Sequence, residues 1–338
     1  MKIKILLVFL SLLLSFEIIA DESEDGSNEE EAKEESKKDD RELISEFVEE
    51  FIFYEGLLKS YQDPENGNTY LELSDEDISK EFIYFAHIIN GTVEAGLFKG
   101  SHIDQAVIKF EKQFNSLNLI RVNTGFYFDP NSELSRQSQS NISDSVIENF
   151  EITHKNDDET TYLIDITKLL KSDNLTKLKS EPRDYDSDSF QVGSLSRSKT
   201  AISKIYNYPK NTDFEVDYVF SNPASYESLR NTSVKLRYTF LEMPQDNGFE
   251  IRFEDPRIGY FTDRVTDLSS TEITPYRDLV QKWNLQKQNP DSAKSKPIKP
   301  IKFWLENTTP NELRPLIKKA VLAWNIAFEK AGFIDAIE

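Results

Sequence analysis

The sequence predicts an α+β fold, in which a mostly antiparallel, β-rich N-terminal region precedes the first strand and first helix of a truncated α/β domain. Apolar and polar residues alternate with a period of two through much of residues 81–254, as in half-buried strands. An extended segment at 297–305 then leads into a strongly amphipathic helix at 313–331. The chain ends at Glu338, before such a domain closes, so we expect the front portion of a larger protein.

Residues 1–20 have the pattern of a secretory signal peptide. Lys2 and Lys4 form a charged start, residues 5–16 are apolar except for Ser11 and Ser15, and Ala20 is a small residue before the expected cleavage. The alternative is a membrane anchor, but the apolar run is short for a span of about 20 residues. We therefore expect export to the periplasm or the medium, with no stable membrane anchor after cleavage.

Residues 21–42 form an acidic leader. They contain twelve Asp or Glu and four Lys or Arg, and almost no apolar side chain. Such a segment cannot bury enough apolar surface to offset the entropy of ordering. The prediction is a disordered spacer.

Residues 43–100 are expected to form a small α+β segment. Apolar residues at three- and four-residue spacing predict a helix within 43–60. The pair Asn66-Gly67 predicts a hairpin turn, and residues 81–90 predict a strand that ends at Asn90-Gly91.

Residues 101–285 are expected to form a β-rich accessory domain. Strands are predicted around 107–110, 126–128 and 162–166, the last leading into a short helix at 167–171. The clearest alternation lies at 215–220, 234–240 and 249–254. One apolar and one charged face indicate an antiparallel sheet that is solvated on one side. A serine-rich stretch at 187–199 predicts a loop.

Residues 286–300 are rich in proline and lysine and are expected to be a linker. A strand is predicted at 301–305, followed by the final helix. Thr309 and Glu312 fit a capping box with Pro310 at the first helical position, although Pro315 leaves the start uncertain by a turn. Gly332 fits a left-handed helix stop.

Charge and composition exclude several classes of function. The formal net charge is −20, so nucleic acid is not an expected partner. The chain has no cysteine, which excludes disulfides, thiolate zinc sites, cysteine nucleophiles and a lipid-modified cysteine.

No residue of this chain is predicted to be catalytic, to bind a cofactor or to ligate a metal. His87, His102 and His154 are the only histidines, and their spacing contains no HExxH and no other zinc signature. Three distant histidines can still meet in space, but ordinary strand and loop histidines are the favoured interpretation. The stretch 192–196 (VGSLS) lacks the second glycine of GxSxG. Asp263, Asp267 and Glu272 lack the glycine and spacing of a calcium loop and are predicted to be surface charges.

An ordered set of segments carries a resemblance to a known family. They are 95–100 (AGLFKG), 141–144 (NISD), 193–200 (GSLSRSKT), 206–212 (YNYPKNT), 255–261 (DPRIGYF), 282–285 (KWNL), 304–310 (WLENTTP) and 323–333 (AWNIAFEKAGF). In this order the chain from about Gly56 to Glu338 resembles the front part of large bacterial secreted zinc-dependent metalloproteases of the metzincin type. In that family, N-terminal domains of unknown function precede the peptidase domain.

The resemblance implies that residues 301–338 begin a truncated metzincin-like peptidase domain. The family's zinc ligands and general-base glutamate lie in a downstream HExxHxxGxxH helix and have no counterpart here. Zinc is therefore expected only in the full-length protein, whose substrate is a protein or peptide. For the matched motifs we expect structural roles, with Asp255-Pro256 and Gly259 shaping a turn and Trp324 in a core.

Two hypotheses follow. In the first, this chain is the N-terminal fragment of an exported zinc-dependent metalloprotease, inactive alone, with the missing C-terminal peptidase domain as its partner in cis. In the second, it is a complete exported, non-catalytic, β-rich binding or scaffold protein. The coding sequence after Glu338 distinguishes them, because an open frame with HExxH supports the first and a stop codon the second.

Overall fold

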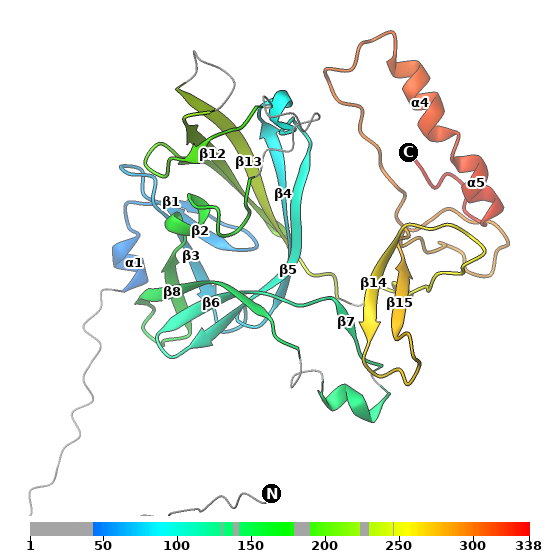
Figure 1. The fold of residues 1–338 in the computed structure, drawn as a ribbon, viewed down its shortest axis with the longest axis horizontal. Helices are drawn as coiled ribbons and strands as arrows, with labels where there is room; N and C mark the ends of the chain where they lie inside the picture. The colour runs from blue at the N-terminus through cyan, green and yellow to red at the C-terminus, as the bar shows by residue number, and fades with distance from the viewer. Residues whose placement is uncertain (1–42, 130, 138–141, 179–189, 224–229, 246) are drawn as a thin grey trace, which may run out of the picture. The chain divides into compact units, whose positions relative to one another are not determined.

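A computed structural model describes residues 43–129, 131–137, 142–178, 190–223, 230–245 and 247–338 (Figure 1). The predicted signal peptide (1–20) and acidic leader (21–42) lie outside these ranges. Within them, antiparallel β-structure dominates and the helices are few and short, as predicted for the β-rich region. In the described part of the chain, no helix combines the length and hydropathy needed to cross a bilayer.

The main sheet contains twelve strands among the described residues, and its pairings are antiparallel. The strand order is β1-β2-β3-β9-β8-β6-β5-β4-β13-β12-β10, and β11 also pairs with β12. The strands are β1 (Ile52–Tyr54), β2 (Lys59–Gln62), β3 (Thr69–Ser74), β4 (Glu81–Asn90), β5 (His102–Gln113), β6 (Ser116–Arg121), β8 (Ser145–Lys155), β9 (Thr161–Asp165), β10 (Ser194–Leu195), β11 (Ala201–Tyr208), β12 (Asn211–Ser221) and β13 (Asn231–Glu242).

The sheet curls so that its two ends meet, where β1 and β2 approach β11. The Asn207 side-chain amide donates hydrogen bonds to the carbonyls of Tyr54 and Leu58, at 2.8 and 2.6 Å. Gly56 lies in this junction, and a Cβ there would stand 2.1 Å from the Asn207 Oδ1. Only glycine lets the backbone come this close, so the closure depends on the residue type at position 56.

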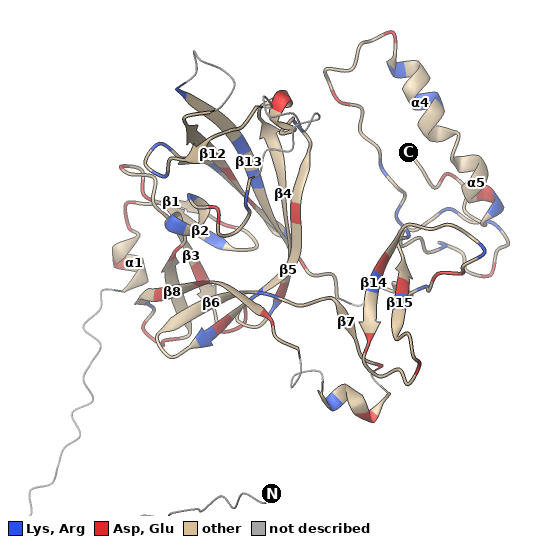
Figure 2. Cartoon of the chain, in the orientation of Figure 1, with Lys and Arg blue, Asp and Glu red and all other residues tan. Residues whose placement is uncertain are grey.

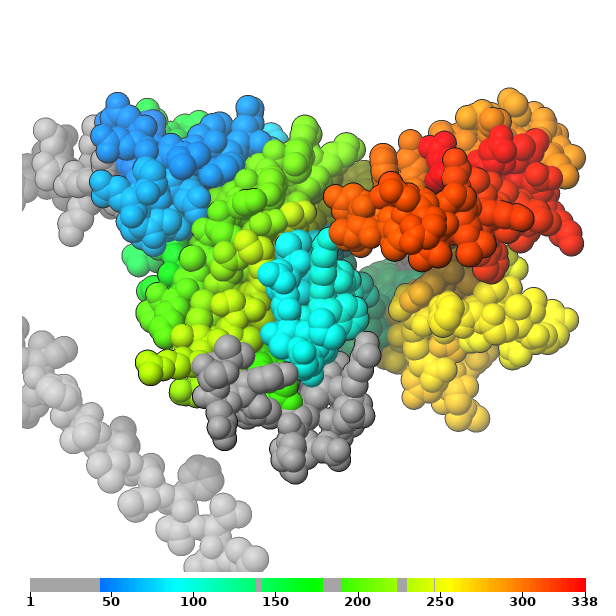
Figure 3. Space-filling model, turned by 90° about the horizontal axis from the view of Figure 1, so that it is seen from above, coloured from blue at the N-terminus to red at the C-terminus, as the bar shows by residue number. Residues whose placement is uncertain are grey.

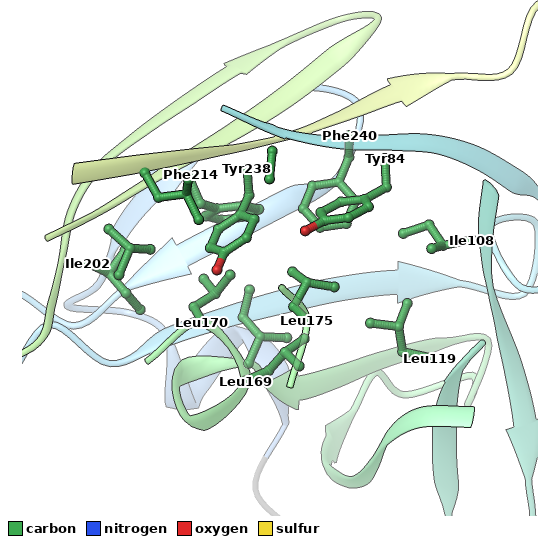
Figure 4. Packing of buried hydrophobic residues seen from close by; sticks show 14 of the residues in the cluster. Tyr84, Ile108, Leu119, Leu169, Leu170, Leu175, Ile202, Phe214, Tyr238 and Phe240 are labelled. Atoms are coloured by element: carbon green, nitrogen blue, oxygen red, sulfur yellow. The ribbon is translucent and has the colours of Figure 1, made fainter. Parts of the chain in front are cut away.

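The interior of the curled sheet is filled by side chains of the strands and by the segment that follows β9. Helix α3 (Thr167–Leu170) and the turn after it carry Leu169, Leu170 and Leu175 into the interior, and all three are at most 3% exposed. Figure 4 shows them facing the aromatic rings of Tyr84 and Tyr238. A short helix therefore supplies part of the core that the strands surround.

Two buried tyrosines anchor this segment through their hydroxyls. The Tyr218 hydroxyl lies 2.6 Å from the Leu170 carbonyl and 3.0 Å from the Ser172 carbonyl, so it can donate to either. It lies 2.6 Å from the Tyr238 hydroxyl, from which it then accepts. Burial raises the pKa of Tyr238 well above its ordinary value, so the hydroxyl stays protonated and remains a donor.

The predicted helix within 43–60 is much shorter than its pattern suggested. Helix α1 is a single turn, Ile44–Phe47, and the chain then enters β1. Ile44 and Val48 pack on Tyr70 and Leu163. The next apolar residues are used by backbone pairing with β2 rather than by a helix face.

Most of the predicted strands are confirmed. Strand β4 has the predicted bounds, Glu81–Asn90, and β2 and β3 form the predicted hairpin, with Gly67 at φ 74°. The strand at 126–128, the strand and helix at 162–171 and the alternating strands within 211–242 also form. The described part of the predicted 187–199 loop is irregular except for β10.

The predicted strand at 249–254 is wrong. Phe253 makes a single antiparallel bridge to Leu279, and the rest of the segment is irregular. Phe249, Ile251 and Phe253 are 43, 56 and 43% exposed. The alternation is real, but no facing layer among the described residues buries the apolar side, so the segment gains little from pairing.

A second sheet has three strands, in the order β15-β14-β7. Strand β14 (Thr262–Asp267) pairs in parallel with β7 (Phe126–Tyr127) and antiparallel with β15 (Tyr276–Val280). Two short 3₁₀ helices, η1 (Val93–Ala95) and η2 (Glu133–Gln137), lie in loops.

The final helix forms in two pieces, α4 (Arg314–Leu322) and α5 (Asn325–Lys330), joined through a tighter turn at residues 323–324. The predicted capping box is wrong, because the N-cap is Leu313 and makes no side-chain cap. The guanidinium of Arg314 instead donates to the carbonyls of Asn307 and Thr309, at 2.8 and 3.0 Å. The Gly332 stop is confirmed by its φ of 94°.

The predicted strand at 301–305 is present only as a short ladder with the chain end. Ile301 forms a parallel bridge with Ile337. The Ile301 N–H donates to the Ala336 carbonyl at 2.7 Å, and the Phe303 N–H donates to the Glu338 carbonyl at 2.9 Å. Two parallel segments joined through a helix are the start of a βαβ arrangement.

We expect Leu170→Ala to lower the free energy of unfolding by about 2–5 kcal/mol, because it opens a cavity in a closely packed interior. Leu170 is 1% exposed. The matched control is Leu134→Ala, whose side chain is 38% exposed and should change stability by no more than about 0.5 kcal/mol. Urea denaturation followed by circular dichroism measures both. Equal effects of the two substitutions would show that the segment after β9 does not belong to the core.

Candidate functional site

Residues 249–338 expose many large hydrophobic side chains. Of the 26 large hydrophobic side chains recorded as exposed in the described residues, 17 lie in this last part of the chain. Only Val265, Val280, Ile301, Ala336 and Ile337 are buried hydrophobic residues there. This region therefore has very little core of its own.

All three tryptophans of the chain belong to this surface. Trp283, Trp304 and Trp324 are 61, 89 and 65% exposed. Tryptophan is a residue type that is highly buried on average, and each exposed large side chain forgoes about 1.5–3 kcal/mol of burial. Trp324 was expected to pack in the core of a completed domain, and it is exposed here because none of the described residues covers its helix face.

The helix pair α4 and α5 provides the most continuous part of the surface, and none of its residues is buried. Leu313, Leu316 and Trp324 recur on one face and are 45, 64 and 65% exposed. Figure 3 shows the two helices, in orange and red, at the surface of the space-filling view. We call this the uncovered helix face (Leu313, Leu316, Ile317, Ala320, Val321, Trp324, Ala327 and Phe328).

The three-stranded sheet contains an ion pair with a buried carboxylate that the sequence did not reveal. Asp267 was predicted to be a surface charge, but it is 1% exposed and pairs with Arg277. The Ser269 N–H and hydroxyl donate to the Asp267 carboxylate at 2.9 and 2.6 Å. Burial favours the neutral acid, but these hydrogen bonds and Arg277 outweigh it and hold the pKa of Asp267 below its ordinary value.

Arg277 is also held between two aromatic rings. Its guanidinium lies 5.4 Å from the Tyr127 ring centre and 4.9 Å from the Phe253 ring centre. The ion pair thus joins β7, β15 and the irregular segment at 249–254. Asp263 and Glu272 are exposed, as predicted.

The structure brings two of the three histidines together. His87 on β4 and His102 on β5 are direct cross-strand partners. His154 lies on β8 and stacks on Phe47, with ring centres 3.9 Å apart. Among the residues that the structure describes, no group of three or more His, Asp or Glu side chains is arranged to hold a metal ion.

A row of charges crosses the outer face of the main sheet beside His87. Glu215, Arg237 and His87 are successive cross-strand partners on β12, β13 and β4, and Figure 2 shows the basic bands on β13. Glu215 is only 4% exposed and pairs with Arg237, whose guanidinium lies 5.1 Å from the Tyr206 ring centre. Burial, and then the nearby Arg237, lowers the pKa of His87.

The sequence predicted this outer face to be solvated, so the burial of its acids was missed. The alternation of charges on neighbouring strands could have predicted their pairing. Acids at 213, 215 and 217 alternate on one strand, and Lys235 and Arg237 alternate on the next, which is the pattern of cross-strand ion pairs.

The remaining motif residues shape the backbone. Gly193 has a φ of 92°, and a Cβ there would lie 2.2 Å from the Ser221 carbonyl oxygen. At 255–261, the Ile258 N–H donates to the Asp255 carbonyl at 2.9 Å, which confirms the turn predicted at Asp255-Pro256, whereas Gly259 lies after this turn. The Arg257 guanidinium donates to the Asp255 carboxylate and lowers the pKa of that group.

Comparison with known proteins identifies one family. The model of a "Domain of unknown function (DUF5117)" matches residues 100–288, more than half of the chain. The chain belongs to this family. No curated protein and no solved structure matches it. The DUF5117 segment runs from just before β5 to just after β15, and β4, which precedes it, lies between β5 and β13. Residues 43–99 therefore complete the sheet of the DUF5117 segment.

We expect Asp267→Asn to destabilise the three-stranded sheet by about 1–3 kcal/mol, because the buried position then no longer offers Arg277 and Ser269 a charged acceptor. The wild-type contribution is fully present above the ordinary aspartate pKa of about 3.9 and is lost as the pH falls through the lower folded-state value. The difference in stability between wild type and variant should therefore shrink below about pH 4.

Hydrogen exchange at residues 262–267, measured between pH 3 and pH 7, tests this expectation. Asp263→Asn is the matched control on the same strand, since Asp263 is exposed. A pH-independent difference for Asp267→Asn would contradict a stabilising ionised carboxylate.

Proposed function

We propose that this chain is the N-terminal part of an exported zinc-dependent metalloprotease, and that residues 301–338 begin its metzincin-like peptidase domain. The observation that carries the proposal is the uncovered helix face beside a short parallel ladder. An amphipathic helix is stable only when its apolar side is buried against another layer. All-parallel sheets occur almost only where both faces are covered.

The ladder between residues 301–303 and 336–338 supports the same proposal. The two parallel segments come before and after α4 and α5 in the sequence. A β-strand, a helix and a parallel β-strand in this order form the repeating unit of an α/β domain. Phe303, Trp304 and Leu305 are 54, 89 and 45% exposed, so both faces of this edge are available for further layers. The family resemblance of residues 304–310 and 323–333 names a metzincin-like domain as that covering structure.

In this proposal the chemistry lies outside residues 43–338. Zinc would be held by the downstream HExxHxxGxxH helix, where it supplies a bound water for attack on a peptide carbonyl. The described residues supply a folded accessory region whose core is complete, and an apolar surface at 249–338 on which the peptidase domain is built. The substrate of the full-length enzyme is a protein or peptide.

An exported binding or scaffold protein is the second candidate. The observation in its favour is the self-sufficient core of the main sheet, which contains 33 buried hydrophobic residues in one cluster. This second candidate does not explain what covers the apolar surface of residues 249–338. We therefore prefer the first candidate.

The direct test uses the whole reading frame. We expect protein expressed through the codons that follow Glu338 to bind one zinc per chain and to cleave a casein substrate. The 338-residue chain should do neither. Metal analysis and a peptidase assay of both proteins measure this. A stop codon directly after Glu338, or stoichiometric zinc in the 338-residue chain, would contradict the proposal.

A substitution on the uncovered helix face tests the covering itself. Leu316 is 64% exposed, so Leu316→Ala should change the stability of the 338-residue chain by less than about 0.5 kcal/mol. In the longer protein the same side chain should be buried, and the loss should be about 2–5 kcal/mol. Lys318→Ala, on the exposed side of α4, is the control and should be neutral in both proteins. Equal effects of Leu316→Ala in the two proteins would show that no downstream layer covers this face.

A further inference from the structure

The hairpin between β5 and β6 places a phenylalanine where glycine or asparagine is favoured. Gln113 and Ser116 are direct partners, so Phe114 and Asn115 form a two-residue turn. Phe114 has a φ of 54°. A bulky side chain at positive φ is an outlier, and such turns favour Gly or Asn. Strain of this kind persists where the surrounding structure imposes it and often accompanies function.

The same side chain is also almost fully exposed. Phe114 is 93% exposed, and it projects from the end of two paired strands. An exposed aromatic ring on a two-residue turn has few conformations to lose on binding, because the strands fix its backbone. Folding does not need this ring in a core, so its strained position calls for another explanation.

An open hollow of about 650 Å³ lies beside the ring on the outer face of β6 and β8. Its lining consists of neutral polar side chains, Phe114 and Val146, with Glu151 as the single ionisable group. This is unusual in a chain of net charge −20. The lining offers no cation to an anionic ligand and too little apolar area for a hydrophobic protein interface.

The neutral side chains are held in place by one another. The Asn149 amide donates to the Ser116 hydroxyl at 3.0 Å and to the Asn118 Oδ1 at 2.6 Å. The Asn118 amide in turn donates to the Gln113 Oε1 at 3.0 Å. This amide ladder (Asn149, Asn118 and Gln113) keeps carbonyl and N–H groups in fixed positions across the strands. Primary amides both donate and accept hydrogen bonds, as hydroxyl groups do.

From these observations we propose that the Phe114 ring and the amide ladder form a binding site for a neutral saccharide. One face of a pyranose ring carries C–H groups, which pack on the electron-rich face of an aromatic ring. Its hydroxyls, at the rim, match the donors and acceptors of the ladder. The absence of basic groups in the lining excludes electrostatic attraction of an anionic ligand. This site is independent of any peptidase activity of a longer protein.

Affinity electrophoresis of the 338-residue chain tests the proposal. Native gels contain mixed-linkage β-glucan, galactomannan, dextran or soluble starch, and retardation reports binding. We expect retardation in at least one of the four. Phe114→Gly should weaken it about tenfold, and Phe114→Tyr should keep it, because the ring supplies the stacking contact. Asn149→Asp should also weaken it, since it replaces an amide of the ladder by a charge.

The glycine variant carries its own folding control. Gly accepts a positive φ without strain, so Phe114→Gly should have a thermal midpoint equal to or above that of the wild type. Tyr208→Ser, at the β11–β12 hairpin, removes another exposed ring (51%) and should leave retardation unchanged. No retardation of the wild type in any gel, or equal retardation of Phe114→Gly, overturns the proposal. Sedimentation of the wild type but not Phe114→Gly with phosphatidylcholine vesicles also overturns it, in favour of a membrane contact.

Discussion

The described structure depends on how the curled main sheet fills its own interior. Strands that alternate apolar and polar residues create an apolar inner face, which must be covered. Here the covering is local in sequence, because the chain leaves β9, forms α3 and places Leu169, Leu170 and Leu175 inside. The Tyr218 hydroxyl then fixes this segment through the carbonyls of Leu170 and Ser172. The closure at Gly56 and Asn207 is possible only around a filled interior.

The C-terminal part of the chain faces the same requirement and does not meet it within the described residues. Helices α4 and α5 have an apolar face but no buried residue, and the parallel ladder at Ile301 involves only a few hydrogen bonds. The order seen there rests on hydrogen bonds rather than on a core, such as those of Arg314 with the carbonyls before α4 and those between Ser295 and the residues after α5. Among the described residues, the two regions thus differ in whether a covering layer is present.

The sequence predicted well those elements whose signal is local. Strand β4 and the β2–β3 hairpin followed from alternation and from Asn66-Gly67, because a strand's faces and a tight turn are set by neighbouring residues. The helix at 43–60 and the strand at 249–254 failed for a non-local reason. In the first segment, the residues from Ile52 onward form a strand that pairs with β2 instead of a helix. In the second, no layer among the described residues covers Phe249 and Ile251.

The site was less predictable than the fold, since its features arise from distant residues. The burial of Asp267 depends on Arg277, Tyr127 and Phe253, which come from three segments. The pairing of His87 with His102 depends on the register of β4 and β5, which spacing alone does not give. The exposure of Trp283 and Trp304 became visible only once the covering of each segment was known.

The net charge gives the uncovered surface a physical context. An exposed apolar patch promotes association between copies of a chain. A net charge of −20 opposes that association through mutual repulsion, which screening by salt weakens. Acidic residues can therefore keep the 338-residue chain dispersed although its apolar face is exposed. Repulsion between whole molecules acts over the Debye length, whereas burial of Leu316 and Trp324 requires contact. Electrostatic repulsion between molecules does not oppose apolar contacts within one chain. An acidic protein can therefore bury an apolar face against another layer of the same chain.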